Sequence, residues 1–170
     1  MKFHVILDGY NLVHSRNFPG KKGRSLESQR DYLVQLIRQY AARTRRHCLV
    51  VFDSKIPFSR QTRKYSRVEV RFSPPHKEAD HVIQEFIRNS KNPRALLVVS
   101  SDREIQHTAR AHGAQVMSSE SFWASELPAR MPPPTNLPAE DDEQKPDGEL
   151  SEQELQEWLR LFTNDEEDDA

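Results

Sequence analysis

The sequence contains very little cysteine and no long hydrophobic stretch. Its one cysteine, Cys48, lies inside a short apolar run, so no intrachain disulfide can form and a reducing compartment is expected. No apolar segment approaches the roughly 20 residues that a membrane helix needs, and the N-terminus enters a strand pattern without the features of a signal peptide. We therefore expect a soluble, cytoplasmic protein with no membrane partner.

The sequence also lacks the motifs of several common sites. Its seven histidines show no HExxH spacing and no CxxC pair is present, which argues against zinc. The GKKG segment at residues 20–23 is no P-loop, because it lacks the spaced GK[ST] and does not follow directly on a strand. A phosphatase with an aspartyl nucleophile would need a second Asp two residues after Asp8, where Tyr10 stands.

Charge divides the chain into a basic body and an acidic tail. Residues 1–130 hold 23 Lys and Arg against 12 Asp and Glu, a net of +11, whereas residues 131–170 hold 2 against 14, a net of −12. The overall hydrophobic content of 35% and mean hydropathy of −0.84 are low for a compact chain, which indicates that part of it is not packed. This distribution favours polyanion binding by the body and modulation by the tail.

Three short hydrophobic runs end at an acidic side chain. They are residues 2–7 followed by Asp8, residues 47–52 followed by Asp53, and residues 95–101 followed by Asp102. Each run is rich in Val, Ile, Leu or Phe and is followed by polar or helix-forming sequence, a pattern typical of a buried parallel strand. In an open α/β sheet, the carboxyl ends of such strands line the ligand crevice.

Helical patterns alternate with these strands. Further strands are expected at 68–72, near a sheet edge, and at 115–117. Helices are expected from Ser25 to about Arg43, from Lys77 to about Asn89, from a capping box of Ser101 and Glu104 to Gly113, and from Ser118 or Ser119 to Leu127. The fold class is therefore α/β: three layers with a central, mostly parallel sheet over residues 1–127. A Pro- and acid-rich linker at 128–149 and an amphipathic acidic helix with an acidic tail at 150–170 follow.

The strand-end carboxylates form a candidate metal site. Carboxylates brought together repel one another, and a divalent cation is the usual remedy. Asp8 is the strongest candidate, because Gly9 relaxes the backbone beyond the strand and lets Asp8 and the amide of Asn11 face one spot. The capping box places Asp102 in the first turn of its helix, where an acid also favours the macrodipole without any catalysis.

Three other acids are ambiguous. On the helix that begins near Lys77, Glu78 and Asp80 lie about equally far to either side of the apolar stripe, so only one of them can reach a metal and periodicity does not choose. Asp53 is either a further ligand or the acid of an Asx turn.

Four motifs, in order, resemble the YacP-like NYN domain family, a branch of the PIN-like nucleases. They are ILDGYN at 6–11, VFD at 51–53, EADHVI at 78–83 and VSSDREI at 99–105, the last helix ending at Gly113 and Ala114. The similarity covers residues 2–127, and residues 128–170 fall outside it. It implies a PIN-like fold and a Mg²⁺- or Mn²⁺-dependent endoribonuclease.

The resemblance also implies roles for individual residues. Asp8, Asp80 and Asp102 would form the acidic triad that holds the metal, with Asn11 as an accessory polar group, so Asp80 is preferred to Glu78. Some relatives are linked to ribosomes and mRNA turnover, which makes mRNA or ribosome-associated RNA the implied substrate.

Basic loops supply the expected contacts with single-stranded or loop RNA. Cations hold backbone phosphates, and an aromatic side chain, Phe58 or Tyr65, can stack on an unpaired base. A solvated basic loop without a role is the alternative. The candidate RNA-binding residues are Lys21, Lys22, Arg24, Lys55, Arg60, Arg63, Lys64, Tyr65 and Arg103.

Other functions compete with the nuclease. A receiver domain also sets Asp residues at strand ends, with Asp53 as its phosphoacceptor, but here the first strand carries one acid and no lysine follows the last strand. A noncatalytic RNA- or ribosome-binding module could keep the fold and the basic surface without cutting RNA. The acidic tail either folds back over the basic face, docks to a protein partner through Leu155, Trp158, Leu159 and Phe162, or only adds solubility.

Overall fold

The computed structural model describes residues 3–20, 25–53, 62–74 and 77–126. The chain divides into two units, Met1–Thr135 and Asn136–Ala170, and everything described below belongs to the first. The predicted linker at 128–149, the predicted helix at 150–170 and the basic-loop residues at 21–24 and 54–61 lie outside the described residues.

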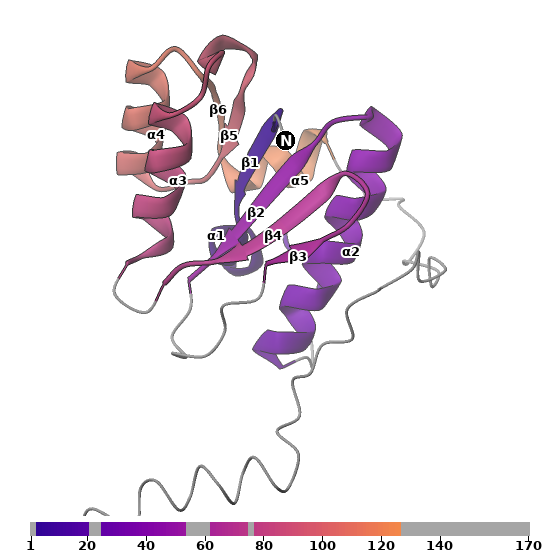
Figure 1. Cartoon of the computed structure of the whole chain (residues 1–170). Coiled ribbons are helices and arrows are strands. Elements are labelled where there is room, and N and C mark those ends of the chain that lie inside the picture. Colours follow the sequence, from indigo (N-terminus) through magenta and orange to yellow (C-terminus); the bar gives the residue numbers. More distant parts are fainter. Residues whose placement is uncertain (1–2, 21–24, 54–61, 75–76, 127–170) are drawn as a thin grey trace, which may run out of the picture. The chain divides into compact units, whose positions relative to one another are not determined.

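A six-stranded sheet forms the centre of the fold (Figure 1). Its strand order is β3-β4-β2-β1-β5-β6, and every neighbouring pair is parallel except β3 with β4. The predicted α/β class with a mostly parallel sheet is thus confirmed, and β4 lies next to the edge strand. The strands are β1 (Val5–Asp8), β2 (Cys48–Phe52), β3 (Arg63–Lys64), β4 (Val68–Phe72), β5 (Leu97–Val99) and β6 (Gln115–Met117).

Helices cover both faces of the sheet, which gives the three predicted layers. Helices α1, α2 and α5 pack on one face and α3 and α4 on the other (Figure 1). Their bounds are α1 (Gly9–His14), α2 (Leu26–Thr44), α3 (Ala79–Arg88), α4 (Arg103–Ala111) and α5 (Ser119–Ser125), with a short 3-10 turn at Pro93–Ala95.

Alternating side chains of the central strands fill two separate cores. In β1, Val5 and Leu7 face the α2 side, whereas Ile6 faces α3 and α4. All five residues of β2 are buried in the same alternating manner. Burial on both faces is what a continuous apolar run predicts for a strand inside a parallel sheet.

Caps fix where the helices begin and end. Ser25 caps α2 and Ser118 caps α5, as expected, and Gly113 adopts φ 80° just beyond the end of α4. The predicted capping box of Ser101 and Glu104 is wrong by one residue. Asp102 is itself the N-cap of α4, and its Oδ1 accepts hydrogen bonds from the backbone N–H groups of Glu104 at 2.8 Å and Ile105 at 3.1 Å.

The sequence did not predict α1, and it gave the wrong reason for Gly9. Gly9 is the first residue of α1, and its φ is not in the left-handed region. A Cβ at this position would lie 2.4 Å from the ring of Phe52. Gly9 is therefore required by close packing of α1 against β2, and the backbone freedom proposed for it is not used.

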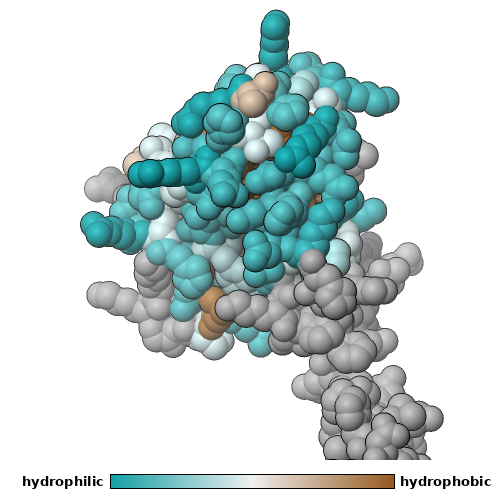
Figure 2. All heavy atoms as spheres, turned by 90° about the vertical axis from the view of Figure 1, so that its left-hand side faces the viewer, coloured by the Kyte–Doolittle hydropathy of each residue, from teal (hydrophilic) through white to brown (hydrophobic). Residues whose placement is uncertain are grey.

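The face formed by α3 and α4 is almost entirely hydrophilic (Figure 2). Among the described residues, Leu26 on α2 is the only large hydrophobic side chain that is exposed. In the same part of the chain, no helix combines the length and the apolar character required to cross a bilayer.

Candidate active site

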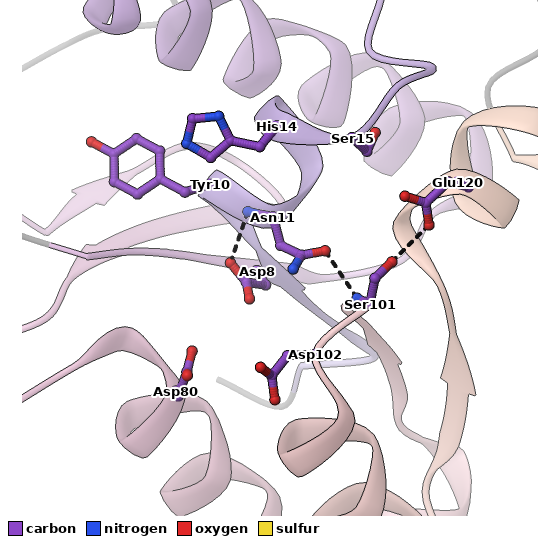
Figure 3. Close-up of a pocket in the computed structure, with 9 residues that line it drawn as sticks. All are labelled: Asp8, Tyr10, Asn11, His14, Ser15, Asp80, Ser101, Asp102 and Glu120. Carbon is purple, nitrogen blue, oxygen red and sulfur yellow. Dashed lines mark hydrogen bonds between the residues drawn. The ribbon is translucent and has the colours of Figure 1, made fainter.

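A pocket of about 320 Å³ opens at the carboxyl ends of β1 and β5. The crossover connections bring the end of β1, the end of β5 and the start of α3 to this edge of the sheet. Figure 3 shows the carboxylates of Asp8, Asp80 and Asp102 directed toward one open space. The lining residues are Asp8, Tyr10, Asn11, His14, Ser15, Asp80, Ser101, Asp102 and Glu120.

Asp8 is the most deeply buried of these carboxylates, with 7% of its surface exposed. Its Oδ1 accepts a hydrogen bond from the backbone N–H of Asn11 at 3.1 Å, and its Oδ2 accepts one from the hydroxyl of Ser100 at 3.1 Å. Burial raises the pKa of Asp8 to about 6, despite the opposing effect of both hydrogen bonds, and the charges of Asp80 and Asp102 raise it further. Two hydrogen bonds thus fix the position of the Asp8 carboxylate, but they do not offset the cost of burying its negative charge.

Asp80 and Asp102 reach the pocket from helix starts on the opposite layer. Asp80 lies in the first turn of α3 and is half-buried. Desolvation raises its pKa, and the nearby charge of Asp102 acts in the same direction. Because Asp102 uses Oδ1 to cap α4, its other oxygen is the one left to face the pocket.

The hydroxyl of Ser100 links two of the acids. It donates to Oδ2 of Asp8 and accepts from the backbone N–H of Asp102 at 3.1 Å. Ser100 is fully buried, and its carbonyl accepts a hydrogen bond from the side chain of Gln106 on α4 at 2.8 Å. Ser100, which sequence reasoning missed, therefore connects the carboxylate of Asp8 to the backbone at the start of α4.

Hydrogen bonds of the Asn11 side chain connect α1 to the loop before α4 and to the start of α5. Its Oδ1 accepts a hydrogen bond from the backbone N–H of Ser101 at 2.9 Å (Figure 3). The same oxygen accepts one from the hydroxyl of Ser119 at 2.6 Å. The side-chain carbonyl of Asn11 is thus occupied by structural contacts, while its backbone N–H orients Asp8.

Comparison with known proteins assigns the chain to a family. The profile of the family described as YacP-like NYN domain matches residues 5–163. The chain belongs to this family. The match runs well past residue 127, so the expectation that the family resemblance stops there is wrong, and residues up to 163 lie within it.

Relatives of the YacP-like NYN family support the assignment. The chain is 28% identical to the uncharacterized protein YacP of Bacillus subtilis (strain 168) over 113 residues, which are 65% of this chain and about two thirds, 66%, of that protein. It is similar to the crystal structure of Rae1 (YacP) from Bacillus subtilis, with a TM-score of 0.57 and 27% identity over 72% of this chain and 71% of that one. A mutant of the same protein gives a TM-score of 0.54 at 26% identity, covering 72% of each chain. The PIN-like fold and a place in a nuclease-like superfamily follow.

Glu120, at the start of α5, is a fourth acid in the pocket of this NYN domain, and sequence reasoning missed it. It lies apart from the other three, beyond Asn11 and Ser101 (Figure 3). The hydroxyl of Ser101 donates to its Oε2 at 2.7 Å, and this hydrogen bond lowers the pKa of Glu120. A capping serine followed by an acid gives no sign of this role, because the same pattern starts many helices.

Two rings flank Asp8 and were also missed. Tyr10 packs its edge against Phe52 with a centroid separation of 5.1 Å, and the ring of His14 lies nearly parallel to Tyr10 at 6.1 Å. Their spacing of four residues would have placed them on one face of a helix, had the helix at 9–14 been predicted. Both rings line the pocket.

The other acidic candidates lie outside the pocket. The side chain of Asp53 accepts a hydrogen bond from the hydroxyl of Ser73 at 2.9 Å, which connects the end of β2 to the residue after β4. Glu78 is exposed at the N-cap of α3. Both are close enough to Asp80 for their charges to raise its pKa, so they add to the negative potential without lining the site.

None of the candidate RNA-binding residues that the structure describes lines the pocket, although Arg103 directly follows the lining residue Asp102. Arg63 and Lys64 form the edge strand β3, and Arg63 lies 3.9 Å from the carboxylate of Asp31. The guanidinium of Arg38 lies over the ring of Tyr65, 4.4 Å from its centroid, so one ring face is already covered. Arg103 is exposed at the start of α4. The remaining candidates, Lys21, Lys22, Arg24, Lys55 and Arg60, fall outside the described residues.

The donor set fits a hard divalent cation. The described lining residues offer carboxylate, amide and hydroxyl oxygens and no sulfur, and Mg²⁺ or Mn²⁺ prefers such ligands. Among the described residues, no three His, Cys, Asp or Glu side chains are arranged to hold a metal ion by themselves. Mg²⁺ commonly keeps several waters and binds through only one or two carboxylates, so the set is suitable. A full triad of direct ligands stays a prediction.

Proposed function

We propose that this chain is a Mg²⁺- or Mn²⁺-dependent endoribonuclease. The observation that supports this most directly is the lining of the pocket. Four carboxylates line it, and no lysine or arginine among residues 3–20, 25–53, 62–74 and 77–126 does so. Burial of Asp8 and the mutual repulsion of Asp8, Asp80 and Asp102 disfavour negative charge in the pocket, and a divalent cation would relieve both effects.

Asp8, Asp80 and Asp102 would hold the metal. Such an ion supplies activation of water and stabilisation of charge on the leaving oxygen during phosphodiester hydrolysis. The chain's own contribution is to fix Asp8 between Asn11 and Ser100, so that its carboxylate needs no reorganisation on binding.

The surroundings of the pocket fit an unpaired RNA strand. Tyr10 and His14 offer aromatic surface beside Asp8, where a splayed base can stack. We therefore favour single-stranded or loop RNA over a duplex. The family resemblance makes mRNA or ribosome-associated RNA the expected source, and the buried thiol of Cys48 agrees with a cytoplasmic location.

The decisive experiment compares cleavage by the full chain and by two matched variants. Single-stranded and hairpin RNAs are incubated with Mg²⁺, Mn²⁺ or EDTA. Asp8→Asn removes one negative charge from the pocket, and Glu104→Gln removes one from an exposed position two residues beyond Asp102. We expect internal cleavage that requires the metal, falls at least about 100-fold in Asp8→Asn and is retained in Glu104→Gln.

Two results would reject the proposal. Equal cleavage by Asp8→Asn and the unsubstituted chain would remove this pocket from the reaction. RNA binding without any cleavage, under every metal condition, would instead favour the noncatalytic RNA- or ribosome-binding module.

A further inference from the structure

Three arginines lie close together at the end of the sheet where β2 and β4 begin, opposite the end that carries the pocket. Arg45 and Arg46 lie in the connection from α2 to β2, and Arg67 lies in the turn from β3 to β4. The side chain of Arg67 donates a hydrogen bond to the carbonyl of Arg45 at 3.4 Å, which brings the two connections together. Figure 1 shows the end of α2 at one end of the sheet and α1 at the other. We call Arg45, Arg46 and Arg67 the arginine cluster.

These arginines differ from those on the neighbouring surface. Arg30, Arg63 and Arg71 each lie within ion-pair distance of a carboxylate. None of the ion pairs found among the described residues involves a member of the arginine cluster. The cluster therefore carries three positive charges that the described part of the domain does not neutralise.

Structural needs account for only part of the cluster. Arg45 follows the last residue of α2, where a cation favours the helix dipole, although it adopts φ 56°, a conformation better suited to Gly or Asn. Arg46 donates to the hydroxyl of Tyr40 at 3.1 Å, yet it is largely exposed, as is Arg45. Neither the position of Arg45 at the end of α2 nor the hydrogen bond of Arg46 to Tyr40 explains why Arg67, from a different segment, lies beside them.

Without a bound cation the pocket repels the phosphate backbone of RNA, because four carboxylates line it and none of the described lysines or arginines does so. Attraction for a polyanion must come from elsewhere on the molecule. Strand β2 connects the two regions: Cys48 begins beside the cluster and Phe52 ends against Tyr10 at the pocket. Five residues of strand separate the two ends by roughly 15 Å in a straight line. Because β2 is buried on both faces, an RNA strand would have to pass over the surface of the domain to contact both regions, which requires more than the roughly five nucleotides that span this distance directly.

We propose that the arginine cluster is a second RNA-binding site, which holds backbone phosphates of the substrate strand at the amino edge of the sheet. The site's role in cleavage rests on the proposed function, but its binding of RNA does not. The cluster would anchor long RNAs, and fragments of two or three nucleotides would not reach it from the pocket.

Salt-dependent binding tests this site without any cleavage. The full chain, in EDTA, is titrated with a fluorescent single-stranded RNA of 20 nucleotides at several KCl concentrations. The test variant is Arg45→Gln with Arg46→Gln and Arg67→Gln. The control is Arg88→Gln with Arg94→Gln and Arg110→Gln, three exposed arginines at positions outside the cluster, so both variants lose the same charge.

For the test variant, the slope of log K, the RNA association constant, against log salt should be shallower by about 2. Each phosphate contact with a single strand contributes about 0.7, and three contacts are removed. Between 1 M and 0.1 M salt, the affinity of the test variant should therefore fall about 100-fold further behind that of the unsubstituted chain. The control should change the slope little. Replacing all three arginines with lysine should restore the slope, because the charge is kept.

Folding of the variants needs its own readout. Thermal unfolding by circular dichroism is measured for each. The single variant Arg45→Gln provides a second route if the triple variant is unstable, because the side chain of Arg45 donates no hydrogen bond among the described contacts. Its slope should fall by about 0.7.

Three outcomes would overturn the inference. The first is an unchanged slope and affinity in the cluster variants, and the second is an equal loss in the control. The third is tighter RNA binding by the cluster variant, which would show that the cluster holds an acidic protein segment such as residues 136–170.

Cleavage kinetics separate this inference from the proposed function. With Mn²⁺ added, the cluster variant should show a raised KM and an unchanged kcat on the 20-nucleotide RNA, whereas Asp8→Asn should lose kcat and keep binding. If no variant cuts RNA, the proposed function fails and the binding measurements still decide the role of the cluster.

Discussion

Replacing Asp8 with asparagine should make the metal-free protein more stable at neutral pH. Folding raises the pKa of Asp8 from 3.8 to about 6, chiefly because burial disfavours its charge. The folded protein therefore binds this proton more tightly than the unfolded chain does, so the stability is greatest below pH 3.8 and falls as the pH rises to about 6. Above that pH the full destabilisation applies.

The size of the effect follows from the shift. About two pKa units correspond to roughly 3 kcal/mol of unfolding free energy, and with only 7% of its surface exposed Asp8 is little screened by solvent. Asparagine is close in shape and can still accept the hydrogen bond from the N–H of Asn11. The variant should thus gain about 2–3 kcal/mol at pH 7.5, and the gain should vanish near pH 4.

Urea unfolding in EDTA, followed by circular dichroism from pH 4 to 7.5, measures this difference. Glu104→Gln is the control, because Glu104 is exposed and should show little pH-dependent gain. Adding Mg²⁺ should stabilise the unsubstituted chain more than Asp8→Asn. A gain of the same size at pH 4 and pH 7.5, or a loss at pH 7.5, would show that the buried charge of Asp8 does not destabilise the fold.

Two further substitutions test how the site is held. Gly9→Ala should destabilise the protein by about 1–3 kcal/mol, because the new methyl group would overlap the ring of the fully buried Phe52; an unchanged urea midpoint would contradict this packing. Ser100→Ala should cost about 1–3 kcal/mol and raise the pKa of Asp8, since it removes the hydroxyl that donates to the carboxylate. The pKa is read from a carbon-13 NMR titration of Asp8, and an unmoved or lower value would refute the role given to Ser100.

The sequence predicted those features that depend on local pattern. Continuous apolar runs identified β1, β2 and β5, and the acid after each run showed which sheet edge carries the site. Helical spacing found the buried stripe of α2, which includes Leu33 and Tyr40. In each case burial on one or both faces of the element produces a pattern of apolar residues within the element itself. Such a pattern can be recognised without knowing the distant residues that pack against it.

Features set by tertiary contacts were missed. Helix α1 is only six residues long and too short to show an amphipathic period, and β3 has two residues and exists because it pairs with β4. Asp102 rather than Ser101 caps α4, and the hydroxyl of Ser101 instead donates to Glu120, 19 residues further along the chain. Only the folded arrangement reveals that partner.

The pocket is built from both ends of the domain, and this orders events during synthesis. Strand β1 lies between β2 and β5. The side-chain carbonyl of Asn11 can accept its two hydrogen bonds only after Ser101 and Ser119 have been synthesised. The indole N–H of Trp123 closes the same seam by donating to the carbonyl of Leu12 at 3.2 Å. A growing polypeptide that has not yet reached α5 already carries Asp8, Asp80 and Asp102, but it lacks Ser119 and Trp123, which hold α1 against the rest of the domain. Any hydrolytic capacity would consequently stay latent until the whole domain has left the translating machinery.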